Sequence, residues 1–258
     1  MQRLVSLTGA NVSYDRYGAG PPLVLVHGAF SDHITNWELV KPSLEREFTV
    51  YAVARRGRGE TDATVGHSLE DESEDVAALI RSIGAPVRLL GHSYGAHVAL
   101  AAAAKAPDRI AKLVLYEAPW PSLVADEALA PLEALAHTEQ WELFALSFFH
   151  EHLAVPLSEL EALRETPHWA PILGDAPATV HDLRALNRYE FDVERFRPVT
   201  APTMLQIGAE SPRGFYVTDA LAHTLPDARI DALPGQAHEG MTTAPHMYAE
   251  RVMRFLQP

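Results

Sequence analysis

The chain has 258 residues, of which 47% are hydrophobic and 21% charged, a composition typical of a globular protein. Its formal charge of −13 repels phosphate groups and anionic lipid, which argues against nucleic acid and a membrane surface as partners. It has no cysteine, so disulfides, a thiolate nucleophile and a cysteine-ligated metal are excluded.

The sequence has no segment that is apolar for long enough to span a bilayer. Its longest apolar block, residues 98–104, is far short of the roughly 20 residues that a spanning helix needs. The first eight residues carry one arginine and no signal-peptide pattern. We therefore expect a cytoplasmic protein.

Short apolar runs rich in valine, isoleucine and leucine recur along the chain and predict strands buried on both faces. These runs are residues 23–26, 49–53, 87–90, 113–116 and 203–207, with a further strand expected at 228–233. A capping-box pattern from Ser68 to Asp71 opens a helix to about Ile83, and the alanine-rich residues 94–106 predict another. This alternation predicts a parallel sheet whose ligands bind at the carboxyl ends of the strands.

The alternation is interrupted by residues 121–195, which have helical patterning only. We expect helices at 123–136 and 139–153, followed by a region broken by prolines 156, 167, 171 and 177. Aromatic side chains are frequent in and beside this segment: Trp120, Trp141, Phe144, Phe148, Phe149, Trp169, Tyr189 and Phe191. The fold class is thus α/β, a mostly parallel doubly wound sheet with a core of residues 1–120 and 196–258. Residues 121–195 form a helical insertion that is either a lid or a packing layer.

The strongest chemical motif is Gly91-His-Ser-Tyr-Gly95, which joins the strand 87–90 to the alanine-rich helix. A G-x-S-x-G sequence between a strand and a helix is the nucleophile elbow. Its serine occupies a sharp turn, and the flanking glycines relieve the crowding there. Ser93 is therefore the predicted nucleophile.

A second motif, His27-Gly-Ala-Phe30, follows the strand 23–26. Its turn brings a backbone N–H toward the reacting oxygen from the side opposite the elbow. We expect the N–H groups of Ala29 and Tyr94 to form an oxyanion hole.

A serine nucleophile needs a base, and the chain has 13 histidines. In this architecture the order along the chain is serine, acid, histidine, which sets aside the histidines before Ser93. His238, in the loop Gly235-Gln-Ala-His238 after the strand 228–233, lies at the sheet edge where Ser93 is expected. The other later histidines fall in helices or in the insertion, so we predict His238 as the base.

Taken together, these motifs and the Arg55-Arg-Gly-Arg-Gly59 turn resemble, in order and spacing, the lidded α/β-hydrolases. The resemblance covers nearly the whole chain. It implies the α/β-hydrolase fold, and in this family the basic turn is the loop after a strand rather than a phosphate site. Where many relatives carry a carboxylate beside that turn, this chain has Ala54.

The acid of the triad has two candidates. Many family members place an aspartate in a G-x-x-D pattern, but here the pattern reads Gly208-Ala-Glu-Ser211, with Glu210 adjacent to the expected position. Glu117 follows the strand 113–116, where some of the haloalkane dehalogenases, which the chain resembles in outline, carry a glutamate. We predict Glu117 as the acid, with Glu210 as the alternative.

These residues predict a serine hydrolase of a small, apolar carboxylic ester or lactone that uses no cofactor. No metal is expected, because His150 and His152 are two residues apart and the chain lacks an H-E-x-x-H motif. The alternatives are a lyase or carbon–carbon hydrolase with the same triad, and a ligand-binding receptor with slow turnover.

Overall fold

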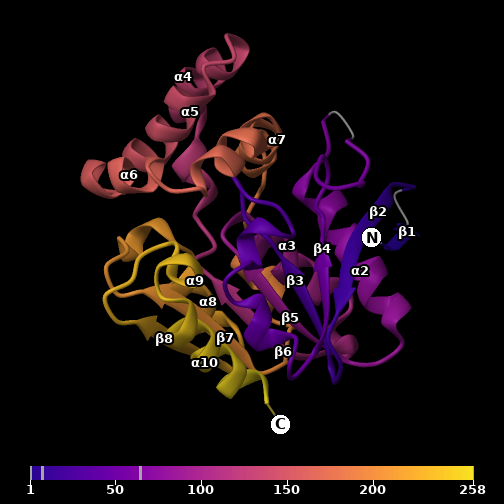
Figure 1. Ribbon diagram of the computed structural model, residues 1–258. Helices are drawn as coiled ribbons and strands as arrows, with labels where there is room; N and C mark the ends of the chain where they lie inside the picture. The colour runs from indigo at the N-terminus through magenta and orange to yellow at the C-terminus, as the bar shows by residue number, and fades with distance from the viewer. Residues whose placement is uncertain (1, 7–8, 64–65, 258) are drawn as a thin grey trace.

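The centre of the molecule is an eight-stranded sheet, seen here in a computed structural model that describes residues 2–6, 9–63 and 66–257 (Figure 1). The strands are β1 (Gln2–Val5), β2 (Asn11–Tyr17), β3 (Pro22–Val26), β4 (Thr49–Val53), β5 (Val87–His92), β6 (Ile110–Tyr116), β7 (Thr203–Gly208) and β8 (Ala228–Leu233). Their order across the sheet is β1-β2-β4-β3-β5-β6-β7-β8. The pairs β1–β2 and β2–β4 are antiparallel, and all other pairs are parallel. The predicted α/β class with a mostly parallel sheet is confirmed.

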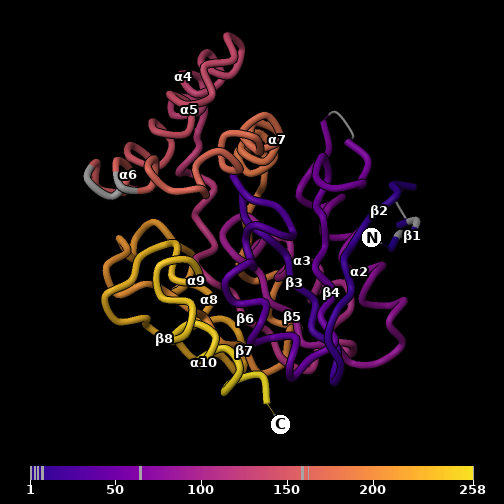
Figure 2. Tube along the Cα trace, viewed as in Figure 1, coloured from indigo at the N-terminus to yellow at the C-terminus, as the bar shows by residue number. Residues whose placement is uncertain are grey.

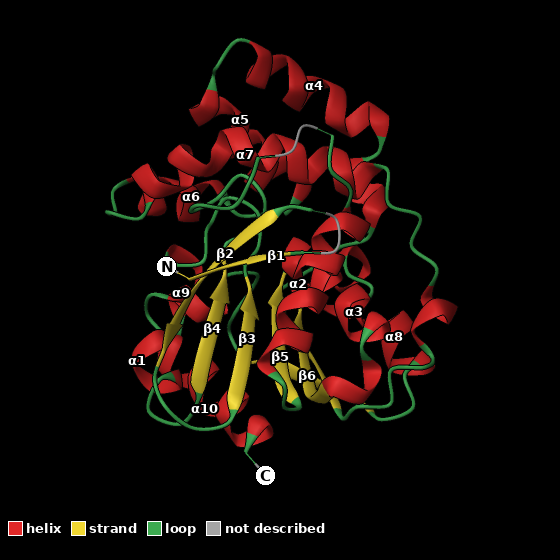
Figure 3. Cartoon of the chain, turned by 90° about the vertical axis from the view of Figure 1, so that its right-hand side faces the viewer, coloured by secondary structure: helices red, strands yellow, loops and turns green. Residues whose placement is uncertain are grey.

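Helices cover both faces of the sheet (Figure 3). One face carries α1 (Lys41–Leu44), α9 (Gly240–Thr243) and α10 (Pro245–Leu256), and the other carries α2 (Leu69–Ile83), α3 (Tyr94–Lys105) and α8 (Thr218–Thr224). Strand side chains alternate between the two layers: Leu23 and Leu25 join the cluster beside α10, whereas Val24 and Val26 join the cluster beside α2 and α3. Both faces of these strands are therefore buried, which is why they could be predicted from continuous apolar runs.

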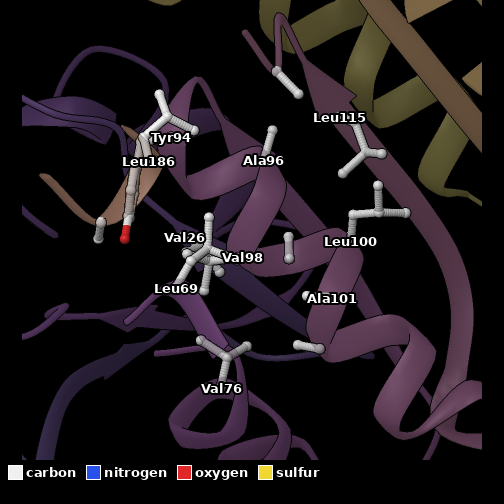
Figure 4. Close-up of a cluster of buried hydrophobic side chains, with 14 of the residues drawn as sticks. Val26, Leu69, Val76, Tyr94, Ala96, Val98, Leu100, Ala101, Leu115 and Leu186 are labelled. Carbon is white, nitrogen blue, oxygen red and sulfur yellow. The ribbon is translucent and has the colours of Figure 1, made fainter. Parts of the chain in front are cut away.

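The layer beside α2 and α3 is packed from short and long side chains that interlock. Val26 and Leu115 of the sheet belong to the same buried cluster as Val76 of α2 and Val98 of α3, and Leu115 lies beside Leu100 (Figure 4). The small side chains of α3 let it lie close against β5, and Ser93 stands at the junction of these two elements.

The predicted start and end of α2 are confirmed. Ser68 Oγ accepts from Asp71 N (3.2 Å), and Asp71 Oδ2 accepts from Ser68 N (2.8 Å), which completes the capping box. At the other end, Gly84 takes a left-handed conformation with φ of 75° and ends the helix.

The helical insertion, residues 121–195, lies beyond the carboxyl ends of the parallel strands (Figures 1 and 2). Its helices are α4 (Asp126–His137), α5 (Trp141–Ser147), α6 (Leu157–Arg164) and α7 (Trp169–Asn187), with a π-helical turn at Phe148–His152. The expected helix at 139–153 is thus divided into α5 and this turn.

The expectation that Pro171 and Pro177 break the chain is wrong, since both lie inside α7. Pro171 falls in the first turn, where its missing N–H has no intrahelical partner to lose. Pro177 lies mid-helix, where α7 continues because buried side chains such as Leu183 pack against the neighbouring helices.

Candidate active site

Ser93 occupies a strained turn between β5 and α3, with φ of 55° and ψ of −123°. A Cβ on Gly91 would lie 2.5 Å from the carbonyl oxygen of Gly95, and one on Gly95 would lie 2.2 Å from that of His27. Only glycine fits at these two positions. The N–H of Ser93 is held by the carbonyl of Tyr116 at 2.8 Å, so the serine side chain projects at the carboxyl edge of the sheet.

The loop that carries His238 lies against this turn. His92 Nε2 donates to the carbonyl oxygen of His238 at 3.1 Å, and the two rings are 4.8 Å apart. The structure therefore brings the neighbourhoods of Ser93 and His238 together. The Ser93 hydroxyl is half-buried and makes no hydrogen bond within the described part of the chain. Such nucleophile–base contacts commonly tighten when a substrate binds.

Glu117 and His238 form a direct contact. His238 Nδ1 donates to Glu117 Oε2 at 2.6 Å, and Glu117 Oε1 accepts from the backbone N–H of Gly208 at 2.7 Å. Glu117 is 1% exposed and has φ of 50°. Both carboxylate oxygens are thus satisfied, and the imidazole is oriented with Nε2 on the side away from Glu117, where it has no hydrogen-bond partner among the described residues.

The pKa of His238 is set by two opposing effects. Burial, the largest effect, lowers it, but the hydrogen bond and the negative charge of Glu117 together raise it above the usual value, with a further contribution from Glu239. By contrast, burial and the neighbouring His238 hold the pKa of His92 well below its usual range. His92 is therefore neutral and acts as a hydrogen-bond donor beside a histidine that can accept a proton.

Glu210, the alternative acid, lies exposed beyond β7. Its backbone N–H donates to Gln236 O at 2.9 Å. Its carboxylate makes no hydrogen bond or ion pair with His238 in the described residues.

The segment after β3 passes directly beside Ser93. A Cβ on Gly28 would lie 3.1 Å from His92 Nδ1 and 3.2 Å from Ser93 Cβ, so a side chain at this position would crowd the turn that carries Ser93. The next N–H, that of Ala29, has no acceptor among the residues the structure describes. Tyr94 is the first residue of α3, where a helix leaves its N–H groups without intrahelical partners. Both predicted oxyanion donors are therefore available for a ligand.

The arginine-rich turn is neutralised by buried carboxylates. Arg55 contacts Asp182 Oδ2 at 2.7 Å and Glu72 Oε2 at 3.2 Å. Arg58 contacts the same Asp182 oxygen at 2.7 Å. Burial raises the pKa of Asp182, but the two guanidinium groups outweigh it and lower that pKa to about 2. A separate pair joins Arg56 to Asp75 at 2.7 Å. The turn is a structural ion-pair network, in keeping with its interpretation as a loop after a strand.

Among the described residues, two groups of side chains have the donor atoms of a metal site, but neither suits an ion. In His67, Glu72 and Asp182, the two carboxylates already bind guanidinium groups. In the group of His92, His238 and Glu239, the donors include the His238 ring that Glu117 orients.

Aromatic side chains of the insertion pack onto the segment that carries Ala29. The centre of the Phe30 ring lies 5.4 Å from the ring centre of Phe144, 5.2 Å from that of Phe148 and 4.9 Å from that of Phe149. These rings are buried, so they dock the insertion onto the loop after β3.

A match to a family model shows the family of this chain. The model of the alpha/beta hydrolase family matches residues 23–254. The chain belongs to the alpha/beta hydrolase family. This α/β hydrolase is 27% identical over 271 residues to 2-(acetamidomethylene)succinate hydrolase of Mesorhizobium japonicum, covering 99% of this chain and 95% of the relative.

Solved structures of α/β hydrolases superpose on nearly the whole chain. A crystal structure of an alpha/beta hydrolase from Sphaerobacter thermophilus has a TM-score of 0.84 at 30% identity and covers 99% of this chain and 100% of its own. The enol-lactonase from Burkholderia xenovorans has a TM-score of 0.80 at 20% identity, with 99% of each chain covered, which shows the shared fold. Together with the family model, these structures place the protein among the hydrolases of this fold. None of its described helices is both long and apolar enough to cross a membrane.

Sequence reasoning missed one residue of this site. The ring of Tyr216 stacks on that of His238 at 5.7 Å with an interplanar angle of 13°, and its hydroxyl lies 3.3 Å from His238 Nδ1. No motif marks Tyr216, because it lies in an irregular segment after β7. A tyrosine in a segment between the last two strands is the only signal the sequence offers.

Proposed function

We propose that this α/β hydrolase cleaves a small carboxylic ester or lactone through an acyl-enzyme, with Ser93 as nucleophile, His238 as base and Glu117 as acid. The observation that carries the proposal is the 2.6 Å contact between His238 Nδ1 and Glu117 Oε2, beside a serine in the elbow conformation. An imidazole held in this tautomer can accept a proton on Nε2.

The first half-reaction follows from these roles. Ser93 Oγ attacks the carbonyl carbon of the substrate while its proton passes to His238 Nε2. Glu117 stabilises the imidazolium that forms. The carbonyl oxygen becomes negative and accepts hydrogen bonds from the N–H groups of Ala29 and Tyr94. Collapse of this intermediate expels the alcohol oxygen, which takes the proton from His238.

The second half-reaction repeats the same steps with water. His238 removes a proton from a water molecule, and the hydroxide attacks the acyl carbon. Ser93 leaves with the proton from His238, and the carboxylic acid is released. No cofactor is needed in either half, because every charge that develops faces a group of this chain.

The helical insertion supports an apolar substrate and the role of a lid over the site. It lies at the carboxyl ends of the strands (Figure 1), and Trp120 and Phe191, 5.5 Å apart, are partly exposed aromatic rings there. Each buried CH₂ of a substrate contributes about 0.8 kcal/mol to binding.

A second candidate is amide hydrolysis by the same groups. It is favoured by the relative whose name states hydrolysis of 2-(acetamidomethylene)succinate, a compound with an acetamido group. The two reactions share every step above except that the leaving atom is nitrogen, which needs the proton from His238 more strongly.

A panel of p-nitrophenyl esters from acetate to octanoate, lactones of matched length and the corresponding p-nitroanilides separates these candidates. We expect ester or lactone turnover to exceed anilide turnover, and Ser93→Ala to lower kcat by about 10³-fold or more. Anilides turned over faster would favour the amide candidate. A folded Ser93→Ala that keeps more than about a tenth of kcat would overturn the serine mechanism.

A further inference from the structure

The peptide group between Gly28 and Ala29 is held by side-chain hydrogen bonds to its carbonyl oxygen. The carbonyl oxygen of Gly28 accepts from His27 Nδ1 and from Arg55 Nη2, each at 2.8 Å. Ser31 Oγ lies 3.2 Å from the same oxygen, but its shorter contact, at 2.8 Å, is to Asn36 Oδ1. In a planar trans peptide the N–H points opposite to the carbonyl. The two donors on this carbonyl therefore also fix the direction of the Ala29 N–H.

Arg55 is the donor among these whose orientation depends on distant parts of the chain. Its Nε also donates to the carbonyl of His27 at 2.9 Å. The guanidinium carbon lies 4.5 Å from the centre of the Tyr94 ring. Nη1 donates to Asp182 Oδ1 at 2.9 Å, and Nη2 donates to Asp182 Oδ2 at 2.7 Å. The side chain is 1% exposed, so no water shell can replace these partners. Two carboxylates bind Arg55: Glu72 of α2, at 3.2 Å, and Asp182, at 2.7 Å. The closer one, Asp182, belongs to α7 of the helical insertion.

The same turn of α7 also holds the other side of Ala29. The N–H of Phe30 donates to Thr179 Oγ1 at 2.8 Å. Thr179 and Asp182 are three residues apart, so they share one face of α7. The two peptide groups that flank Ala29 are therefore both held. Arg55 binds the carbonyl of the Gly28–Ala29 peptide, and Thr179 binds the N–H of the Ala29–Phe30 peptide.

We propose that Arg55, held by Asp182 and assisted by Thr179, is a positioning residue that aims the Ala29 N–H, so that the oxyanion hole is complete only while α7 is docked. This inference rests on the proposed function, in which Ala29 N–H binds the oxyanion. A charged donor on the Gly28 carbonyl also polarises the peptide, which strengthens its N–H as a donor. Asp182 and Thr179 of the helical insertion thereby contribute to the chemical step through the Ala29 N–H and not by direct contact with the reacting atoms.

The decisive comparison is between Arg55→Lys and Arg56→Lys. Both arginines lie in one turn and are buried in ion pairs, but among these two only Arg55 contacts the Gly28 carbonyl. A lysine at position 55 keeps the charge and cannot bind Asp182 and two carbonyls together. We expect Arg55→Lys to lower kcat about 30-fold or more with KM within about threefold, since one oxyanion donor is worth about 10²-fold to 10³-fold. Arg56→Lys should stay within about threefold of wild type in kcat.

A second readout uses stoichiometric labelling by diethyl p-nitrophenyl phosphate. Ser93 Oγ forms a bond to phosphorus, its proton goes to His238, and p-nitrophenolate leaves with the electron pair of the broken P–O bond. The phosphoryl oxygen requires the same hole. The labelling rate constant of Arg55→Lys should therefore fall in parallel with kcat, whereas a defect that is merely structural would lower the labelled fraction and leave the rate constant of the folded molecules unchanged.

Milder variants keep the test usable if Arg55→Lys does not fold. Thr179→Val removes the acceptor for Phe30 N–H and should lower the labelling rate about three- to tenfold, and Thr179→Ser should restore it. Asp182→Asn should lower that rate more than its matched control Asp75→Asn, which loses the buried pair with Arg56.

Equal labelling rates for the folded Arg55→Lys and Arg56→Lys variants would overturn the proposal. So would a full rate in Asp182→Asn or in Thr179→Val. Failure of the proposed function is recognised separately: the wild type would then show no Ser93-dependent turnover of esters or lactones, while labelling of Ser93 would still report on the oxyanion hole.

Discussion

Glu117 Oε2 and His238 Nδ1 meet at 2.6 Å although the residues are 121 positions apart in the chain. Glu117 directly follows the last residue of β6, and His238 lies in the loop after β8. Between them stands β7, whose last residue, Gly208, donates its N–H to the other oxygen of Glu117. The glutamate therefore crosses the end of a neighbouring strand, which its long side chain permits.

This arrangement predicts different effects of changing the two candidate acids. Glu117→Gln should lower kcat about 10²-fold or more, because the amide misorients the imidazole and does not support its charged form. Glu210→Gln, at an exposed position, should lower kcat less than about tenfold. Steady-state kinetics of both variants with one ester measures this. The reverse order would assign the acid to Glu210, and two mild effects would indicate a Ser–His dyad.

The pH dependence of activity should carry the signature of the same contact. Glu117 raises the pKa of His238, and the base must be neutral to accept the proton, so kcat/KM should rise with pH and have its midpoint above about 6.5. In Glu117→Gln the burial of the ring is no longer opposed, and the midpoint should move to lower pH. Profiles between pH 5 and 9 test this. An identical midpoint in wild type and variant would mean that another group controls the profile.

The buried His97 should make the fold sensitive to acid. Burial lowers the pKa of His97 to about 4, while in the unfolded chain it is near 6.5. Between these values the unfolded state binds a proton that the folded state does not, so stability present above pH 6.5 is lost as the pH falls toward 4. His27 and His92, whose pKa values burial also lowers, add to this loss.

Urea unfolding of His97→Gln at pH 7.5 and pH 5 isolates the contribution of this histidine. The glutamine can still donate to Pro119 O, which His97 Nε2 contacts at 2.6 Å. The loss of unfolding free energy between the two pH values should be about 2 kcal/mol smaller than in wild type. The exposed His246→Gln is the control and should keep the wild-type loss. The same loss in both variants would remove His97 as a source.

Substitution of the second glycine of the elbow should unfold the site. In Gly95→Ala the new Cβ would lie 2.2 Å from the carbonyl oxygen of His27 and 2.5 Å from that of Val26, both backbone atoms. We expect a loss of about 3 kcal/mol or more in unfolding free energy. Gly174→Ala is the matched control: it lies in α7 with no atom within 4 Å of its Cβ position, and it should gain up to about 1 kcal/mol. A loss below about 1 kcal/mol for Gly95→Ala would show that β3 can move away from α3.

The sequence predicted the parts of the fold whose burial follows a local pattern. β4 and β8 have the expected bounds, and β3, β5, β6 and β7 extend the expected runs by one to three residues. The antiparallel β1 and β2 were not predicted. β2 mixes exposed and buried side chains at the sheet margin, so its polar residues resemble those of a loop.

The sequence yields candidate site residues only where a single motif marks them. The turn at Ser93 and the loop at His238 each have a local signal. The ion pair between Asp182 and Arg55 has no local sequence signal, because the two residues are 127 positions apart. An aspartate on a helix usually indicates a solvent-exposed face. The choice between Glu117 and Glu210 depended on which side chain crosses the end of β7, a question of three-dimensional reach.

Residues with positive φ show where the backbone conformation lowers the stability of the fold. Among the described residues, five that are not glycine have positive φ, and three of them are Phe30, Ser93 and Glu117. A residue with a Cβ that is held at positive φ costs about 1 kcal/mol or more. A chain selected for thermal tolerance alone would carry glycine at all three places and would lose the hydroxyl, the carboxylate and the ring on which the insertion docks. Replacing Ser93 by glycine should therefore give an inert protein with a higher melting temperature than the native enzyme.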